Sequence, residues 1–142
     1  MTGILLLDNS AWTRLGGPAV RDQRREEIAD AMRAGQIAVS LPLLLEAGYS
    51  ARDASDHGQL IDELLSLPLL SIDEQVERRA LDAQRQLARV GHHRLPPVDV
   101  LTAALADHHD VGILHYDNDY DLIAAKTDLR IQSTWLAPRG TL

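Results

Sequence analysis

Four acidic residues stand at places in the sequence where a carboxylate can do chemistry. Asp8 ends the apolar run "ILLL", and Asp117 follows the apolar run "GILHY". Glu46 interrupts the Leu-rich stretch "LPLLLEAGY", where an unpaired carboxylate is costly to bury. Asp99 lies near the start of the apolar segment "PPVDVLTAALA". If these side chains share one site, they repel one another, and a Mg²⁺ or Mn²⁺ ion would remove that conflict.

Each acid also has a purely structural interpretation. Asp8 and Asp117 can cap helices that follow strands, and Asp99 can complement the dipole of a helix. Asp119 and Asp121, in "YDNDYD", suit a turn or a solvated face, although Asp119 is close enough to Asp117 to assist it. The elements that carry the acids must decide between these interpretations.

Short apolar runs alternate with amphipathic stretches along the chain, which predicts a parallel sheet covered by helices on both faces. The clearest helix is residues 73–90, where an apolar stripe runs from Val76 to Val90. The predicted strands are residues 4–7, 37–40, 69–72, 112–116 and 129–133. The predicted helices are residues 21–34, 42–52, 54–67, 73–90, 98–108 and 119–125.

Such a sheet places its functional sites beyond the carboxyl ends of the strands, where the strand order reverses. With the strand order 3-2-1-4-5, this point lies between the first and the fourth strand. Asp8 follows the first strand and Asp117 the fourth, so the two acids face each other across one crevice that Glu46 and Asp99 can join. The sequence thus predicts an α/β fold of three layers, with residues 1–142 in a single domain.

Composition narrows the class of protein. The chain has 142 residues, no Cys and a formal net charge of −7. The absence of Cys excludes disulfides, thiolate zinc sites and cysteine nucleophiles, and the negative charge argues against coating nucleic acid through bulk positive charge. Cations held by carboxylates would still let an enzyme cut nucleic acid. Without a long apolar run or the features of a signal peptide, we expect a cytoplasmic protein with no membrane partner.

The order of four segments, "LLLDNSAW", "LLLEAGYSAR", "PPVDVLTAALA" and "LHYDNDYDLI", resembles the PIN-domain ribonucleases, in particular the VapC-type toxins of toxin–antitoxin pairs. The resemblance implies a PIN-like sheet, endonucleolytic cleavage of RNA, homodimers, and inhibition by a cognate antitoxin. It further implies one or two Mg²⁺ or Mn²⁺ ions held by an acidic quartet, with an auxiliary acid and a supporting hydroxyl. The matching residues are Asp8, Glu46, Asp99 and Asp117 for the quartet, Asp119 for the auxiliary acid and Ser10 for the hydroxyl.

Three positions depart from the family pattern. Asn9 stands where Ser or Thr is common, Tyr120 replaces a frequent Phe, and His115 occupies a place where a small hydroxyl residue is usual. We assign a substrate-binding role to Arg52 and His115. Two alternatives stay open, because His115 can equally pack inside the protein and Arg52 can belong to a solvated face.

The predicted reaction is hydrolysis of an RNA phosphodiester bond by a metal-activated water, which leaves a 5′-phosphate and a 3′-hydroxyl. Two other functions fit parts of the sequence. An aspartyl-phosphate phosphatase needs a D-x-D start and a later Lys, whereas this chain has D-N-S and its single Lys, Lys126, lies past the fourth strand. A non-catalytic PIN-fold module that binds RNA or protein is the second alternative, and the presence of all four acids argues against it.

The segment from Pro42 to Leu70 contains more Leu than two helices at the edge of a small sheet need for packing. An exposed remainder would form an apolar patch of the kind that marks an interface, which predicts a homodimer. The alternative is that the two helices bury every one of these residues within the monomer. The residues are Leu43, Leu44, Leu45, Leu60, Ile61, Leu64, Leu65, Leu67, Leu69 and Leu70.

Overall fold

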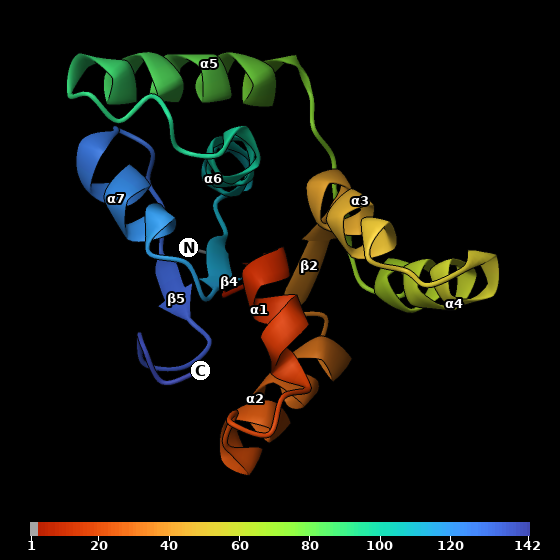
Figure 1. The fold of residues 1–142 in the computed structure, drawn as a ribbon. Helices are drawn as coiled ribbons and strands as arrows, with labels where there is room; N and C mark the ends of the chain where they lie inside the picture. The colour runs from red at the N-terminus through yellow and green to blue at the C-terminus, as the bar shows by residue number, and fades with distance from the viewer. Residues whose placement is uncertain (1–2) are drawn as a thin grey trace.

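The computed structural model describes residues 3–142, whose five strands form one parallel sheet in the order β3-β2-β1-β4-β5 (Figure 1). This order confirms the predicted one. None of the helices in this part of the chain combines the length and apolar character that a membrane crossing needs. The strands are β1 (Leu5–Leu7), β2 (Ile37–Ser40), β3 (Leu69–Leu70), β4 (Gly112–His115) and β5 (Ser133–Trp135). The helices are α1 (Asn9–Leu15), α2 (Asp22–Arg33), α3 (Leu41–Tyr49), α4 (Ala54–Leu65), α5 (Glu74–Arg89), α6 (Pro97–His109) and α7 (Asp119–Lys126).

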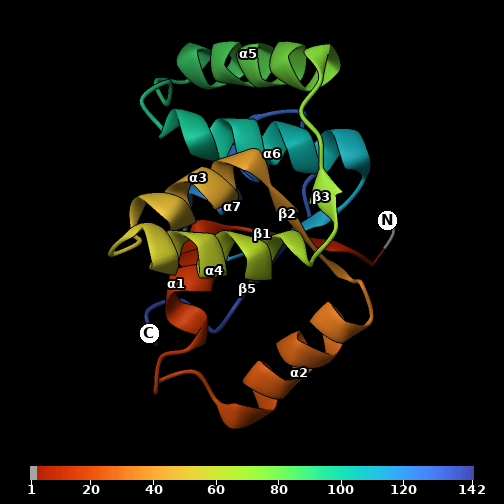
Figure 2. The same ribbon diagram turned by 90° about the vertical axis from the view of Figure 1, so that its right-hand side faces the viewer.

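Apolar side chains on the two faces of the sheet form separate clusters, and helices cover both. Neighbouring residues of one strand point to opposite faces, so Leu6 joins the cluster with α5, α6 and α7, and Leu7 joins the cluster with α1 to α4. Ile113 and Leu114 of β4 divide in the same way. Figures 1 and 2 show α5 lying outside α6, against which it packs. The predicted three-layer α/β fold is confirmed.

Helix α1 lies outside the predicted elements, and its sequence explains why. Ala11 is its one buried residue, so the segment has no apolar periodicity to reveal a helix. The helix is instead specified at its start, where the side chain of Asp8 accepts a hydrogen bond from the backbone N–H of Ser10 at 3.0 Å. The capping interpretation of Asp8 is therefore correct, and the question is whether the same carboxylate also serves a site.

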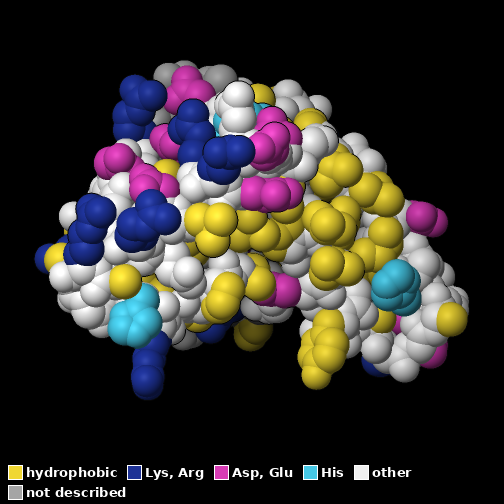
Figure 3. All heavy atoms as spheres, turned by 90° about the horizontal axis from the view of Figure 1, so that it is seen from above, with side chains coloured by type: hydrophobic (Ala, Val, Ile, Leu, Met, Phe, Trp, Pro, Cys, Tyr) yellow, Lys and Arg dark blue, Asp and Glu magenta, His cyan; other side chains and the backbone are white. Residues whose placement is uncertain are grey.

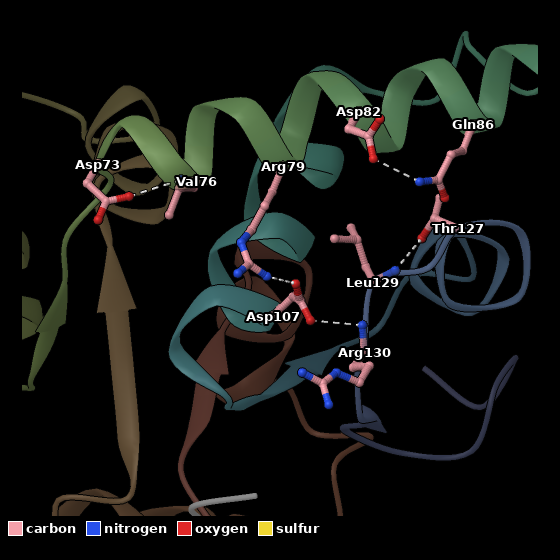
Figure 4. Close-up of polar contacts among 9 residues, drawn as sticks. All are labelled: Asp73, Val76, Arg79, Asp82, Gln86, Asp107, Thr127, Leu129 and Arg130. Carbon is pink, nitrogen blue, oxygen red and sulfur yellow. Dashed lines mark hydrogen bonds and ion pairs between the residues drawn. The ribbon is translucent and has the colours of Figure 1, made fainter.

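The fifth strand begins at Ser133, so the prediction of a strand over residues 129–133 is wrong except for its last residue. The backbone N–H groups of residues 128–130 are bonded to side chains instead of to a neighbouring strand, and Figure 4 shows the bonds of Leu129 and Arg130. Leu129 is buried in the cluster beneath α5 and α6. The side chains that accept these hydrogen bonds are Gln86 for Asp128, Thr127 for Leu129 and Asp107 for Arg130, at 2.7, 3.3 and 3.0 Å.

The parallel register brings the ends of β1 and β4 together. Leu7 is the register partner of Leu114, and the backbone N–H of Asp8 donates to the Leu114 carbonyl at 3.0 Å. The residue that follows β1 therefore lies beside the turn that follows β4. This is the edge of the sheet at which the strand order reverses, where a functional site is expected.

A substitution at Gly112 tests the tight packing of the central strands. A Cβ atom there would lie 2.7 Å from Leu5 Cδ2 and 3.2 Å from the carbonyl oxygen of Gln132. We expect Gly112→Ala to lower the free energy of unfolding by about 1–3 kcal/mol, the usual cost of overpacking. Gly58→Ala in α4 is the control, because beyond the neighbouring residues and backbone of its own helix no atom lies within 4 Å of the added Cβ. This change should raise the free energy of unfolding by about 0.5–1 kcal/mol. Urea denaturation measures the free energy of unfolding of both variants. If both substitutions change it in the same direction, the tight packing around Gly112 is contradicted.

Candidate functional site

Three carboxylates lie close together at the carboxyl edge of the sheet. One oxygen from each of Asp99, Asp117 and Asp119 lies within 4.8 Å of the other two. Asp99 is in the first turn of α6, Asp119 is the first residue of α7, and Asp117 lies in the turn between β4 and α7. Two of these residues belong to the predicted quartet, and the third is the predicted auxiliary acid.

Asp8 is connected to this group through a tyrosine. The hydroxyl of Tyr120 donates a hydrogen bond to Asp8 Oδ1 at 2.6 Å and lies 3.4 Å from Asp99 Oδ1. Asp8 Oδ2 accepts two hydrogen bonds from Ser10, from its backbone N–H at 3.0 Å and from its hydroxyl at 2.6 Å. The Ser10 hydroxyl accepts in turn from the backbone N–H of Tyr116 at 2.9 Å. Asp8 thus caps α1 and faces the other acids at the same time, and we call Asp8, Asp99, Asp117 and Asp119 the acid cluster.

Tyr120 is the site residue that reasoning from the sequence missed. Its side chain is fully buried. Burial, together with the charges of Asp8 and Asp99, holds the pKa of its hydroxyl well above the ordinary value, so the group remains a hydrogen-bond donor. The sequence did contain one sign of this role, because Tyr120 stands where Phe is frequent in the family. The ring packs as Phe would, and the added hydroxyl supplies a hydrogen bond between two acids.

Asp99 is the most strongly perturbed acid of the cluster. Burial, followed by the charges of Asp117 and Asp8, raises the pKa of Asp99 to about 8. Asp99 Oδ2 is buried and has no hydrogen-bond partner among residues 3–142. A buried polar atom of this kind calls for a partner, and clustered carboxylate oxygens are the donors that hard divalent cations prefer. The residues present therefore fit a divalent metal centre.

Glu46 approaches the acid cluster from α3. It is half-buried, and burial, followed by the charge of Asp8, raises the pKa of its carboxyl. The influence of Asp8 indicates that the two carboxylates lie near each other. The three closely spaced oxygens come from other residues, so a metal-binding role for Glu46 stays a prediction.

His115 lies inside the protein, next to the turn that carries Asp117. Its side chain has no exposed surface. Nδ1 accepts a hydrogen bond from the backbone N–H of Asp117 at 3.1 Å, and Nε2 lies 2.6 Å from Ser133 Oγ. Burial lowers the pKa of the imidazole, and this effect is larger than that of the nearby acids, whose negative charges raise the pKa. A ring with neither exposure nor an unused nitrogen does not reach an RNA phosphate, so the predicted substrate-binding role of His115 does not fit, and the packing alternative does.

Arg52 lies on the surface between α3 and α4. Its backbone N–H donates to Asp56 Oδ2 at 3.0 Å, and its guanidinium lies 3.5 Å from the same oxygen with 86% of the side chain exposed. Such exposed pairs contribute little energy, so they do not hold the side chain in one place. The substrate-binding role of Arg52 stays a prediction.

The raised pKa of Asp99 predicts how the stability of the metal-free protein depends on pH. From about pH 4 to about pH 8 the unfolded chain loses the Asp99 proton while the folded chain retains it, so stability falls as the pH rises. Asp99→Asn removes this contribution, and thermal unfolding in EDTA should show a smaller loss of stability between about pH 5 and pH 8. Asp119 and Glu46 also have raised pKa values, so the stability of the Asp99→Asn variant should still fall somewhat as the pH rises. An undiminished slope in the variant would contradict the assignment.

Tyr120→Phe tests the hydroxyl between the acids, because it removes that group and keeps the ring. A buried acceptor that loses its donor costs about 1–3 kcal/mol, and we expect this loss of stability in EDTA. In saturating Mn²⁺ the loss should shrink, since a cation offsets the charge that the hydroxyl no longer satisfies. Tyr116→Phe is the control, because its hydroxyl accepts from the backbone of Leu142 near the end of the chain. Urea denaturation showing equal effects of Tyr120→Phe in EDTA and in Mn²⁺ would argue against this role.

Comparison with known proteins places the chain in a family. The model of the PIN domain matches residues 5–126. Ribonuclease VapC51 of Mycobacterium tuberculosis is 39% identical over 137 residues, or 96% of each chain. Ribonuclease VapC18 of the same species is 37% identical over 142 residues, which cover 98% of this chain and 99% of that one.

Solved structures share the fold at much lower identity. A chain in the crystal structure of DNA-bound VapBC from Salmonella typhimurium has a TM-score of 0.72 at 16% identity, over 94% of this chain and 98% of that one. A chain in VapBC-1 from nontypeable Haemophilus influenzae has a TM-score of 0.74 at 13% identity, with the same coverage of both chains. With its acids gathered at the carboxyl edge of a 3-2-1-4-5 sheet and relatives that match it almost from end to end, this chain belongs to the PIN-domain family, in its VapC group.

Proposed function

We propose that this protein is a divalent-metal-dependent endoribonuclease and the toxin of a toxin–antitoxin pair. The observation that carries the proposal is the group of Asp99, Asp117 and Asp119 oxygens within 4.8 Å, together with the unpartnered Asp99 Oδ2. Relatives of nearly full length that bear the name ribonuclease support RNA as the substrate. An RNA substrate agrees with a cytoplasmic location, and we take residues 1–142 to act as one PIN-like unit.

Mg²⁺ or Mn²⁺ would be held by Asp99, Asp117 and Asp119, with Asp8 and Glu46 beside them. When bound, such an ion supplies an activated water and a positive charge opposite the phosphate. Without it, the negative charge of these side chains repels an RNA phosphate. Binding of substrate and of cation at this site should therefore reinforce each other.

The residues around the acids keep them in position and leave water as the nucleophile. Tyr120 and Ser10 hold the two oxygens of Asp8, and the backbone N–H of Asp119 donates to Asp117 Oδ1 at 2.9 Å. The hydroxyl of Ser10 is bonded to Asp8, and the ring of His115 is buried, so neither side chain is placed to attack phosphorus. Attack by water leaves a 5′-phosphate and a 3′-hydroxyl on the products.

Substitution of the acids tests the proposed reaction. Asp8→Asn and Asp117→Asn should each abolish detectable RNA cleavage, and EDTA should abolish cleavage by the wild type until Mn²⁺ is restored. The metal-free Asp117→Asn protein should also be more stable than the wild type, because a repelling charge is removed. Glu26→Gln, an exposed change on α2, is the control and should cleave normally.

Two results would count against the reaction. Cleavage by purified Asp117→Asn protein at the wild-type rate would exclude the metal centre as the catalytic site. A wild-type protein that binds RNA without cutting it in saturating Mn²⁺ would favour the alternative of a non-catalytic binding module. End-labelled RNA analysed on a denaturing gel distinguishes these outcomes.

A cognate antitoxin is the proposed protein partner. The support comes from the structures that share this fold, which include VapBC assemblies and a toxin-antitoxin complex from Klebsiella pneumoniae with a TM-score of 0.62.

An exposed apolar surface supports a homodimer. The outer side of α3 carries Leu41, Leu45 and Tyr49, spaced by four residues and exposed by 52, 64 and 91%, and Leu65 at the end of α4 and Leu69 in β3 are exposed by 48 and 50%. We call these five residues the α3–α4 apolar face, and Figure 3 shows apolar side chains gathered on that side of the molecule. The alternative in which the monomer buries every Leu of the segment is wrong. A second copy of the chain is the proposed occupant.

Two leucines of equal exposure give a matched test of the dimer. Leu45 on α3 and Leu81 on α5 are each 64% exposed, and only Leu45 belongs to the α3–α4 apolar face. Light scattering should give about twice the 15.7 kDa chain mass for the wild type and for Leu81→Glu, and the monomer mass for Leu45→Glu. A monomeric wild-type protein at micromolar concentration would contradict the proposal.

A further inference from the structure

A buried imidazole supports Asp117, one of the acids proposed to hold the cation. His115 Nδ1 accepts a hydrogen bond from the backbone N–H of Asp117 at 3.1 Å. On its other side, the Asp117 carboxylate is held by the backbone N–H of Asp119 at 2.9 Å. The conformation of the turn, and with it the direction of the carboxylate, therefore depends on an Nδ1 that carries no hydrogen.

The contacts of the second ring nitrogen determine which tautomer His115 adopts. Nε2 lies 2.6 Å from Ser133 Oγ, and the Ser133 hydroxyl donates to Asp121 Oδ1 at 2.5 Å. A hydroxyl has one hydrogen, so Ser133 can offer His115 only a lone pair, and Nε2 must carry the ring hydrogen. Asp121 is itself fixed, because the indole N–H of Trp135 donates to its Oδ2 at 3.0 Å.

Aromatic packing holds the ring in this orientation. The centroid of the His115 ring lies 4.9 Å from that of Tyr120 and 5.0 Å from that of Trp135. The same Tyr120 donates to Asp8. A continuous set of contacts thus leads from the exposed Asp121 through a buried ring to the acid cluster.

We propose that Asp121, Ser133 and His115 form a positioning relay that sets the direction of the Asp117 carboxylate for cation binding. The inference rests on the proposed function, because the cation is the one proposed for the acid cluster. The three residues act through Asp117 and touch neither substrate nor cation. With the opposite tautomer, the Nδ1–H group would meet the N–H of Asp117, and the turn would lose the hydrogen bond that shapes it.

Asp121→Asn tests the relay at the surface, where a nearly isosteric change does not threaten the fold. The Asn carbonyl accepts from Trp135, and its NH₂ group then donates to Ser133. Because Asn offers Ser133 no acceptor, the Ser133 hydroxyl hydrogen becomes free to donate to His115 Nε2, which favours the ring hydrogen on Nδ1. We expect the affinity for Mn²⁺, measured on purified protein by the EPR signal of the free ion, to fall roughly tenfold or more, as for other residues that orient metal ligands. Asp128→Asn, another exposed acid past the end of α7, is the control and should bind Mn²⁺ like the wild type.

A pair of substitutions at His115 separates positioning from simple packing. Asn places a carbonyl oxygen where Nδ1 stands and can still accept from Asp117, whereas Gln reaches Ser133 and leaves the Asp117 N–H without its acceptor. Both remove the ring, and a packing role predicts a loss for each that is no smaller for Asn, the smaller side chain. The relay predicts that His115→Asn retains most of the Mn²⁺ affinity and that His115→Gln loses roughly tenfold or more.

The tautomer itself gives a readout that needs no variant. Nitrogen-15 NMR of the wild type in EDTA should show His115 as the neutral ring with hydrogen on Nε2, and Asp121→Asn should shift hydrogen to Nδ1. A wild-type ring with hydrogen on Nδ1, or equal Mn²⁺ affinity in Asp121→Asn and the wild type, would overturn the relay. If Asp117→Asn also binds Mn²⁺ normally, the proposed metal centre fails as well. If Asp117→Asn loses the ion while the relay variants keep it, only the relay fails.

Discussion

Repulsion among carboxylates at one edge of the sheet is the constraint on which the rest of the structure depends. Burial of Asp99 removes the water that would screen its charge, so the charges of Asp117 and Asp8 raise the cost of ionising it. Apart from contacts among the carboxyls themselves, such as that of Asp99 with Asp119, the described hydrogen bonds of the acid cluster come from neutral donors: the hydroxyls of Tyr120 and Ser10 and backbone N–H groups. Within residues 3–142, the ion pairs of Arg are formed with other acids. A basic partner would cancel the negative charge permanently, whereas neutral donors hold the acids in place and leave their charge available to a cation.

The sequence predicted the part of the fold that hydrophobic patterns encode. The alternation of strands and helices predicted the parallel sheet, and the strand order adopted for it placed Asp8 beside the turn that follows β4, as the structure has it. Asp8 also shows that a structural and a functional interpretation need not compete. The oxygen that accepts from Ser10 caps α1, and the oxygen that accepts from Tyr120 faces Asp99. An Asp at a helix start beside the end of a parallel strand satisfies both requirements with one conformation.

What the sequence did not predict depends on contacts between distant residues. Helix α1 has one buried residue and is specified by its cap, which leaves no periodic signal. The β5 boundary is displaced because Gln86 and Asp107, on α5 and α6, bind the backbone that precedes it. The buried position of His115 depends on Ser133 and Asp121, which reach it only after β5 has paired with β4. Tyr120 is the instructive case, since one hydroxyl beyond the expected Phe turned a core residue into part of the site.

Anomalous diffraction from a crystal grown in Mn²⁺ would test the metal centre most directly. The account predicts an anomalous peak in contact with oxygens of Asp99 and Asp117, including the Asp99 Oδ2 that has no protein partner. It also predicts that the Tyr120 hydroxyl remains on Asp8 in that crystal. Absence of a peak between these carboxylates at saturating Mn²⁺ would contradict the claim that this edge of the sheet is built to hold a cation.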